Sequence, residues 1–283
     1  MNFWTTFTWQ QVGISCLIGL VICEINLYFT SAVLHRGMCH RAIEYPAWLK
    51  RAVAFWLWIT VCIPPLTWIA AHLHHHANAD AEDDPHSPAV KSFWKVLFLT
   101  WYYVPDWVRR NRQLADERYL ASFRKERFLW WMDRLGTANG NFYIQIVLSL
   151  ALGPIAIAFW ISRIVPYMLA SGYVNAIGHT SGTRPYGAIG TDASGVLQKF
   201  AGYLAGGEPL GHNFHHRHPS SPRFRLSRFD PGFWFGIRIL QGVSVGRRWS
   251  PPPGGDLQKG EFRRPGRPTA GKNTQEVSLK RDR

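Results

Sequence analysis

The chain has 283 residues, 47% of them hydrophobic, and its 32 basic against 18 acidic side chains give a formal net charge of +14. This length suits one large domain or two small ones. The 14 Trp and 17 Phe residues suit membrane interfaces as well as a large core. The excess positive charge predicts an anionic partner: lipid headgroups, phosphate-bearing substrates or nucleic acid. The four cysteines lack CxxC spacing, which argues against a zinc knuckle or a disulfide framework.

The first long apolar segment covers residues 11–34. At about 1.5 Å per residue it is long enough to cross a hydrocarbon layer about 30 Å thick. Basic residues accumulate directly after it, at Arg36, Arg41, Lys50 and Arg51, and such residues mark the cytoplasmic side of a span. We therefore expect the N-terminus to lie outside the cell.

A second apolar stretch, Ala52–Ala71, separates two groups of histidines. If this stretch simply crossed the membrane, the two groups would lie on opposite faces and would not share a site. Pro64 and Pro65 in its second half would also break a regular helix. We therefore predict a re-entrant or surface-lying helix pair, with both histidine groups on the cytoplasmic side.

The next two segments differ in their charge. Residues 89–140 interleave aromatic and basic positions, a pattern typical of helices that lie in the membrane interface. Residues 141–177 contain a single charge, Arg163, and predict a helical hairpin that turns near Gly153-Pro154 or at Arg163.

These segments together predict an all-α integral membrane protein. We expect about three transmembrane helices, interfacial helices and a cytoplasmic, histidine-rich cap that holds two metal ions. The predicted membrane domain covers residues 1–249. Residues 250–283 are rich in proline, glycine and charge and almost lack apolar side chains, so they predict a disordered basic tail.

The 12 histidines lie in four places: residues 35 and 40, residues 72–86, residue 179 and residues 212–218. Two of these places carry HxxHH spacing, which on a helix puts three imidazoles on one face. Imidazole binds iron, copper and zinc, and a closed zinc site takes only about four ligands, so the number of histidines favours two metal ions. Asp80 and Asp84 follow His76 by one and two helical turns, where they could accept hydrogen bonds from ligand imidazoles. His74 points away from the shared face.

The motifs HRGMCH, HLHHH with the following DPHSP, NAIGH and HNFHH resemble the histidine boxes of membrane-bound fatty acid desaturases. The resemblance covers roughly residues 25–240 and is greatest to the acyl-CoA and acyl-lipid branch that includes stearoyl-CoA desaturase. It implies an oxidoreductase with two iron ions, which uses O2 to remove two hydrogens from a long-chain acyl group. The acyl group would be carried on coenzyme A or a lipid, and Δ9 is a candidate position. An external donor (ferredoxin, rubredoxin or a b-type cytochrome) would supply electrons.

The resemblance also assigns residues to the site. The implied metal ligands are His35, His40, His72, His75, His76, His179, His212, His215 and His216. Asn175 is implied to contact a metal through water, and His86, in the DPH segment, to support the ligands from behind them. His74 and His218 have no ligand role in this pattern.

The chain departs from the family pattern in three places. Family members usually have two spans before the first box, whereas 34 residues precede His35, enough for one. Glu208 stands four residues before His212 instead of three, which argues against a role for Glu208 at the site. No haem-binding HPGG segment is present, so we expect a separate electron donor. We expect the protein in the bacterial inner membrane, with its active site facing the cytoplasm.

Other functions use similar features. The same boxes serve hydroxylases, carotenoid ketolases and enzymes that form hydrocarbons from acyl groups, so the product chemistry stays open. A membrane metal-transport or metal-storage protein would instead place its histidines along a pathway within the spans. A nucleic-acid partner is not expected, because the excess charge lies at the flanks of apolar segments and in the tail.

Overall fold

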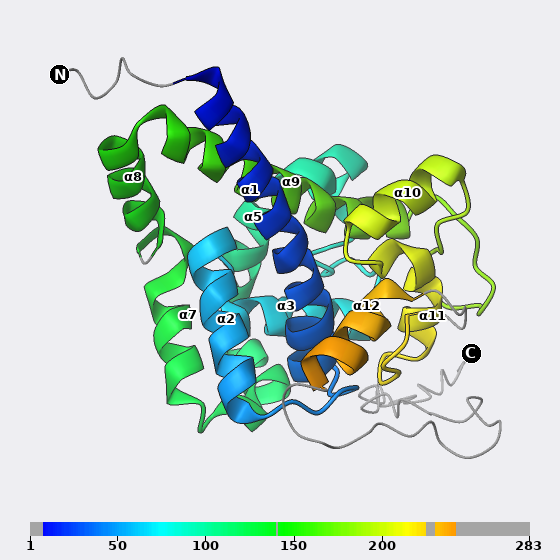
Figure 1. Ribbon diagram of the computed structural model, residues 1–283. Coiled ribbons are helices and arrows are strands. Elements are labelled where there is room, and N and C mark those ends of the chain that lie inside the picture. The colour runs from blue at the N-terminus through cyan, green and yellow to red at the C-terminus, as the bar shows by residue number, and fades with distance from the viewer. Residues whose placement is uncertain (1–7, 140, 225–229, 242–283) are drawn as a thin grey trace, which may run out of the picture. The chain divides into compact units, whose positions relative to one another are not determined.

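The computed structural model describes residues 8–139, 141–224 and 230–241, whose regular elements are all helical (Figure 1). Within these residues the sole β-type pairing is an isolated bridge between Thr183 and Asp192. The prediction of an all-α protein is therefore confirmed. The described residues belong to one unit, Met1–Pro251. The predicted tail, residues 250–283, lies outside them and stays a prediction.

The first span is one continuous helix that changes its winding near its end. The α-helix α1 (Trp9–Phe29) runs directly into the π-helix η1 (Thr30–Cys39). His35 lies on η1 and His40 ends it, with its backbone N–H donating to the His35 carbonyl (3.0 Å). In an α-helix, residues five apart point about 140° away from each other. The wider i→i+5 turn of a π-helix brings them onto one face.

The second apolar stretch forms two helices, α2 (Ala47–Val61) and α3 (Pro65–Ala77), which meet at an angle of 95°. Cys62 ends α2 in the left-handed conformation (φ 59°), and Pro65 begins α3. The break predicted at Pro64-Pro65 is confirmed. Because the chain bends there, α3 carries its histidines back towards η1, against which it packs.

The aromatic and basic segment forms two longer helices, α5 (Phe93–Arg110) and α7 (Arg127–Asn139). One side of α5 packs against α9, and half or more of the surface of several aromatic side chains on α5 is exposed: Trp94, Phe98, Trp101 and Tyr102. An exposed aromatic side on an amphipathic helix agrees with an interfacial position. Four short helical segments connect this region: α4 (Pro88–Lys91), α6 (Arg112–Leu114), η2 (Ala115–Tyr119) and η3 (Ala121–Phe123).

The predicted hairpin consists of α8 (Asn141–Leu152) and α9 (Pro154–Gly178), which packs along α1 (Figure 1). The chain turns at Gly153 (φ 61°), whereas Arg163 lies inside α9, so the alternative turn at Arg163 is wrong. The 12 residues of α8 extend about 18 Å, too short for a hydrocarbon layer. The described residues thus contain two helices able to span a membrane, or three spans if α2 and α3 count as one.

The C-terminal part of the described chain is made of short helices. After α9 come α10 (Val196–Leu204), the 3₁₀-helix η4 (Glu208–Gly211), α11 (His212–Arg217), α12 (Pro231–Phe233) and the π-helix η5 (Trp234–Gln241). Both η4 and α11 contact α9, whose C-cap residue is His179. This packing brings the last two histidine motifs together.

The contact between α5 and α9 gives a test of the fold. A Cβ at Gly172 of α9 would overlap the backbone carbonyl of Leu97 on α5, whereas a Cβ at Gly13 of α1 would meet nothing within 4 Å. We expect Gly172→Ala to destabilise the protein by about 1–3 kcal/mol, because backbone cannot move aside cheaply. Gly13→Ala should be neutral or slightly stabilising. Thermal unfolding in detergent measures both, and equal unfolding temperatures would contradict the packing.

Candidate metal centre

The structure gathers the nine histidines into two groups. Within each group, one nitrogen of every ring lies within 4.8 Å of those of the others. The five-histidine group consists of His35, His40, His72, His76 and His215. The four-histidine group consists of His75, His179, His212 and His216. The nine histidines that the family resemblance implied as ligands thus lie together in the structure, although ligation itself stays a prediction.

The spacing within the five-histidine group fits a metal ion. The Nε2 atom of His215 lies 3.0 Å from that of His35 and 2.9 Å from that of His76, and the Nε2 atoms of His40 and His72 are 3.0 Å apart. Two nitrogen ligands at right angles, each about 2.1 Å from an ion, are about 3.0 Å apart. The ring nitrogens are therefore positioned to share one ion.

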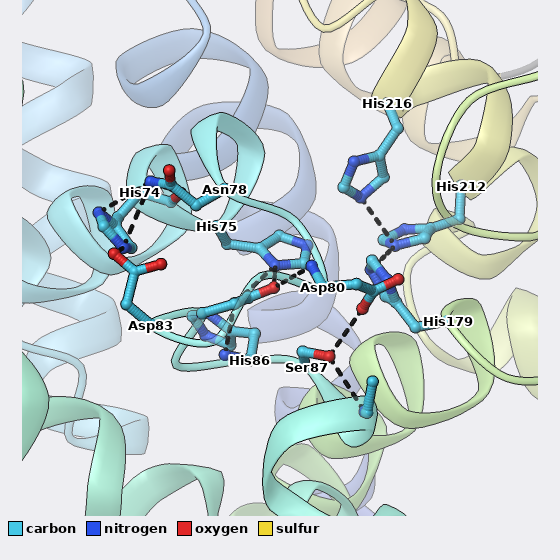
Figure 2. Close-up of polar contacts among 12 residues, drawn as sticks. His74, His75, Asn78, Asp80, Asp83, His86, Ser87, His179, His212 and His216 are labelled. Atoms are coloured by element: carbon cyan, nitrogen blue, oxygen red, sulfur yellow. Dashed lines mark hydrogen bonds and ion pairs between the residues drawn. The ribbon is translucent and has the colours of Figure 1, made fainter. Parts of the chain in front are cut away.

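The four-histidine group has the same spacing. Nε2 of His212 lies 3.1 Å from Nε2 of both His179 and His216, as Figure 2 shows. His75 completes this group with its ring centroid 4.7 Å from that of His179 and 5.0 Å from that of His216. Nε2 of His75 is buried and has no hydrogen-bond partner among the described atoms, which is expected of a nitrogen meant for a metal.

Each HxxHH motif divides its histidines between the two groups. On α3, His72 and His76 belong to the five-histidine group and His75 to the other. On α11 the allocation is reversed, because His212 and His216 join the four-histidine group while His215 joins the other. Two histidines four residues apart thus belong to the same group, and the histidine between them belongs to the other group.

The predicted carboxylates, Asp80 and Asp84, contact two histidines of the four-histidine group. Nδ1 of His75 donates to Asp84 (2.8 Å), and both side chains are fully buried. Nδ1 of His179 lies 3.1 Å from Oδ1 of Asp80, which also accepts a hydrogen bond from Ser87 (2.7 Å; Figure 2). A carboxylate at Nδ1 fixes the tautomer and leaves Nε2 for a metal.

Glu208 corrects one expectation. Its Oε1 lies 3.0 Å from Nδ1 of His35, and its side chain is buried, so it contacts a histidine of the five-histidine group. The expectation that a separation of four residues from His212 keeps Glu208 away from the site is therefore wrong. The extra residue is accommodated in η4, which follows Gly207 in a left-handed conformation (φ 83°). Separation along the chain did not reveal this contact because His35 comes from a distant helix.

The titration behaviour of the site suits metal binding. Burial, followed by the charge of neighbouring histidines, lowers the pKa values of His212, His215 and His216 well below the usual range. Neutral imidazole is the form that binds metals. Burial alone would raise the pKa of the Asp84 carboxyl, but the hydrogen bond and charge of His75 outweigh it and hold the value at about 2. Asp84 is therefore an anion at neutral pH.

His86 is hydrogen-bonded to Asp84, and its ring lies beside that of His75. Its backbone N–H donates to Asp84 Oδ1 (2.8 Å), while its ring centroid is 5.5 Å from that of His75. Burial lowers the pKa of His86 to about 3, with the nearby charge of His75 as the next cause. Asn175 lies one turn before His179 and donates to the Ser171 carbonyl (3.1 Å), so its predicted contact through water stays a prediction.

His74 and His218, like His86, lie outside both groups. His74 is buried, with Nδ1 3.0 Å from the Tyr119 hydroxyl, Nε2 2.9 Å from Asp83, and the ring of Trp107 4.3 Å away. His218 packs on Phe214 instead. His74 is therefore a packing residue that joins α3 to α5 and η2.

Arg36 is a residue whose place the sequence did not indicate. The positive-inside pattern marked it as a flanking charge, but it is fully buried. Its guanidinium lies 3.6 Å above the Phe224 ring and 3.6 Å from Asp230. Phe224 in turn stacks on His215, with ring centroids 4.7 Å apart. A buried cation thus lies one aromatic ring away from the five-histidine group.

Taken together, these features define a helical membrane protein with two buried histidine groups suited to metal binding. The chain belongs to the fatty acid desaturase family, whose sequence model matches residues 7–233. It is therefore an oxidoreductase, as the resemblance of its histidine boxes predicted.

Named relatives are similar over most of their length. An sn-2 palmitoyl-lipid 9-desaturase from Nostoc sp. (strain 36) is 22% identical over 259 residues, covering 88% of this chain and 85% of the relative. An sn-1 stearoyl-lipid 9-desaturase from Anabaena variabilis is 25% identical, with 84% and 83% covered. An acyl-CoA C20 Delta5-desaturase from Anemone leveillei is 25% identical, with 84% and 73% covered.

The position of His74 outside both groups can be tested. His74→Leu should keep the metal content of the unaltered protein, because no predicted ligand is removed. It should lower the stability by about 1–3 kcal/mol, because the polar partners of a buried imidazole lose their contact. Metal per protein by mass spectrometry and thermal unfolding in detergent check both parts. A marked loss of metal in this folded variant would contradict the assignment.

Proposed function

We propose that the protein is an O2-dependent fatty acyl desaturase whose nine histidines hold two iron ions. The observation that carries the proposal is the division of these histidines into adjoining groups of five and four. Neutral imidazoles are suitable ligands for iron. When bound, two irons would supply the oxidising chemistry that removes hydrogen from an unactivated acyl chain, which no side chain can do.

The protein's own part is to bind and orient the acyl substrate and to exclude water from the site. Trp68 stacks on His72 (4.9 Å, 7° between planes) and meets the edge of His35. Phe224 covers His215 from the other direction and is fully buried. These aromatic rings fix the imidazole planes and keep water from the ligands, which protects a reactive site from side reactions.

We propose a long-chain acyl group on a lipid or on coenzyme A as the substrate, with Δ9 as a candidate position. Two of the relatives are named as lipid 9-desaturases and another as an acyl-CoA Delta5-desaturase, so the carrier and the position differ between them. The electrons would come from a separate ferredoxin, rubredoxin or b-type cytochrome. We further propose a bacterial inner membrane location, with the site facing the cytoplasm.

A cavity of about 610 Å³ is suited to the anionic headgroup of such a substrate. Part of its wall is the stretch of η1 between His35 and His40. Its lining combines apolar side chains, among them Met38 and Leu129, with three cationic and two acidic ones, which are Arg41, Lys50, Arg51, Glu44 and Glu126. Glu126 pairs with Arg51 (3.0 Å), which leaves Arg41 and Lys50 as the cations proposed to meet the headgroup. Such a mixture suits a phosphate joined to an apolar chain.

This assignment predicts a kinetic effect. The double variant Arg41→Gln/Lys50→Gln should raise KM for the acyl substrate with little change in kcat, because the lost contacts are the same in the bound and reacting states. Arg109→Gln on α5 removes an exposed charge that is paired with Asp106 and does not line the cavity, and it should leave KM unchanged. Steady-state assays with the same substrate compare them. An unchanged KM in the double variant would exclude this cavity as the headgroup site.

The alternatives are hydroxylases and hydrocarbon-forming oxidases, which use the same kind of site, and a metal transporter. A transporter would need histidines spaced along a pathway, whereas here they form two closed groups. Product analysis separates the remaining enzymes. Expression in a host with a known lipid profile, followed by mass spectrometry of the acyl chains, should reveal new double bonds at a defined position. Hydroxylated or hydrocarbon products would favour the alternatives.

His75 provides the test of the metal site itself. His75→Ala should abolish desaturation and remove iron from the four-histidine group, while the protein still inserts into the membrane. Iron per protein, membrane fractionation and acyl analysis measure these three properties. Full activity with the metal content intact would contradict the proposed site.

A further inference from the structure

The charges that surround the two histidine groups differ. In the four-histidine group, two ligands face carboxylates through Nδ1: His75 faces Asp84, and His179 faces Asp80. The oxygen–nitrogen distances are 2.8 and 3.1 Å. No described cationic side chain forms an ion pair with either carboxylate apart from the histidines themselves. This position therefore carries two uncompensated negative charges next to its ligands.

The five-histidine group has one such carboxylate, Glu208, at 3.0 Å from His35. It also has the buried guanidinium of Arg36, which is stacked on Phe224 and so separated from His215 by one ring. Asp230 lies 3.6 Å from this guanidinium and partly compensates it, but it touches no ligand. The ligands of this position thus receive less negative charge than those of its neighbour.

We infer that the two metal positions are electrically unequal, and that an iron ion in the five-histidine position is reduced at a higher potential than one in the four-histidine position. This inference rests on the proposed function, because it assumes that both positions bind iron. A carboxylate hydrogen-bonded to a ligand imidazole makes the ring a stronger donor. Its negative charge also favours the more highly charged metal ion, and in a buried site this effect is only weakly screened.

The carboxylates are positioning residues that act through the histidines, and the chain offers a matched control for them. Asp83 lies 2.9 Å from Nε2 of His74, an ion pair between a carboxylate and a buried histidine, although the side chain of Asp83 is 58% exposed. His74, however, belongs to neither group. Neutralising Asp83 therefore removes a carboxylate from a buried histidine near the site without changing a predicted ligand.

The test uses the full chain in detergent, loaded with iron-57 and reduced in steps, with Mössbauer spectra recorded at each potential. In the unaltered protein we expect a mixed-valent form midway, because one iron is reduced before the other. Asp80→Asn should raise the potential of the iron in the four-histidine position, which is the lower of the two. It should therefore narrow the range of potentials over which the mixed-valent form exists. Glu208→Gln should raise the potential of the iron in the five-histidine position, which is the higher of the two, and should widen this range. Asp83→Asn should leave this range unchanged.

The outcomes are distinct. Simultaneous reduction of both irons in the unaltered protein, or changes of this range opposite to those expected, would overturn the inference. An equal change of this range in Asp83→Asn would also overturn the inference, because removing a carboxylate that contacts neither group would then have the same effect. If Asp80→Asn does not fold or retain iron, Asp84→Asn makes the same test at the same group. Iron content measured beforehand separates this result from failure of the proposed function, since a protein that binds fewer than two irons refutes the latter.

Discussion

The constraint on which the structure depends is the burial of many imidazoles in a small volume. A buried polar group is costly unless it is bonded, and a buried imidazolium beside others is costlier still. The chain meets this cost by engaging one nitrogen of several rings with a carboxylate, at His35, His75 and His179. The other nitrogens point at one another, an arrangement that is favourable with a metal ion between them.

The helices can be understood as the means of bringing these rings together. The π-helical end of the first span puts His35 and His40 on one face, and the 95° bend between α2 and α3 returns the chain to meet them. The end of α9 and the short helix α11 complete the site. The long apolar helices serve as supports, and the first of them changes to π-helical winding where His35 lies.

Much of this was predictable because local spacing controls direction. HxxHH, the prolines at 64 and 65, and the acidic residues after His76 each act within a few turns of their own helix. What could not be predicted depends on distant partners. The contact of Glu208 with His35 joins residues 173 positions apart. The burial of Arg36 depends on Phe224 and Asp230, and the spacing of HxxHH alone does not show how its histidines divide between two ions.

That division has a mechanical consequence. Because α3 and α11 each contribute histidines to both groups, neither group can shift without rotating a helix that also holds the other. The distance between the two groups is therefore tied to the pitch of two short helices. His35, His40 and His179, however, come from the ends of the two helices that are long enough to span a membrane, so a tilt of either helix in the bilayer would act on the groups through these residues.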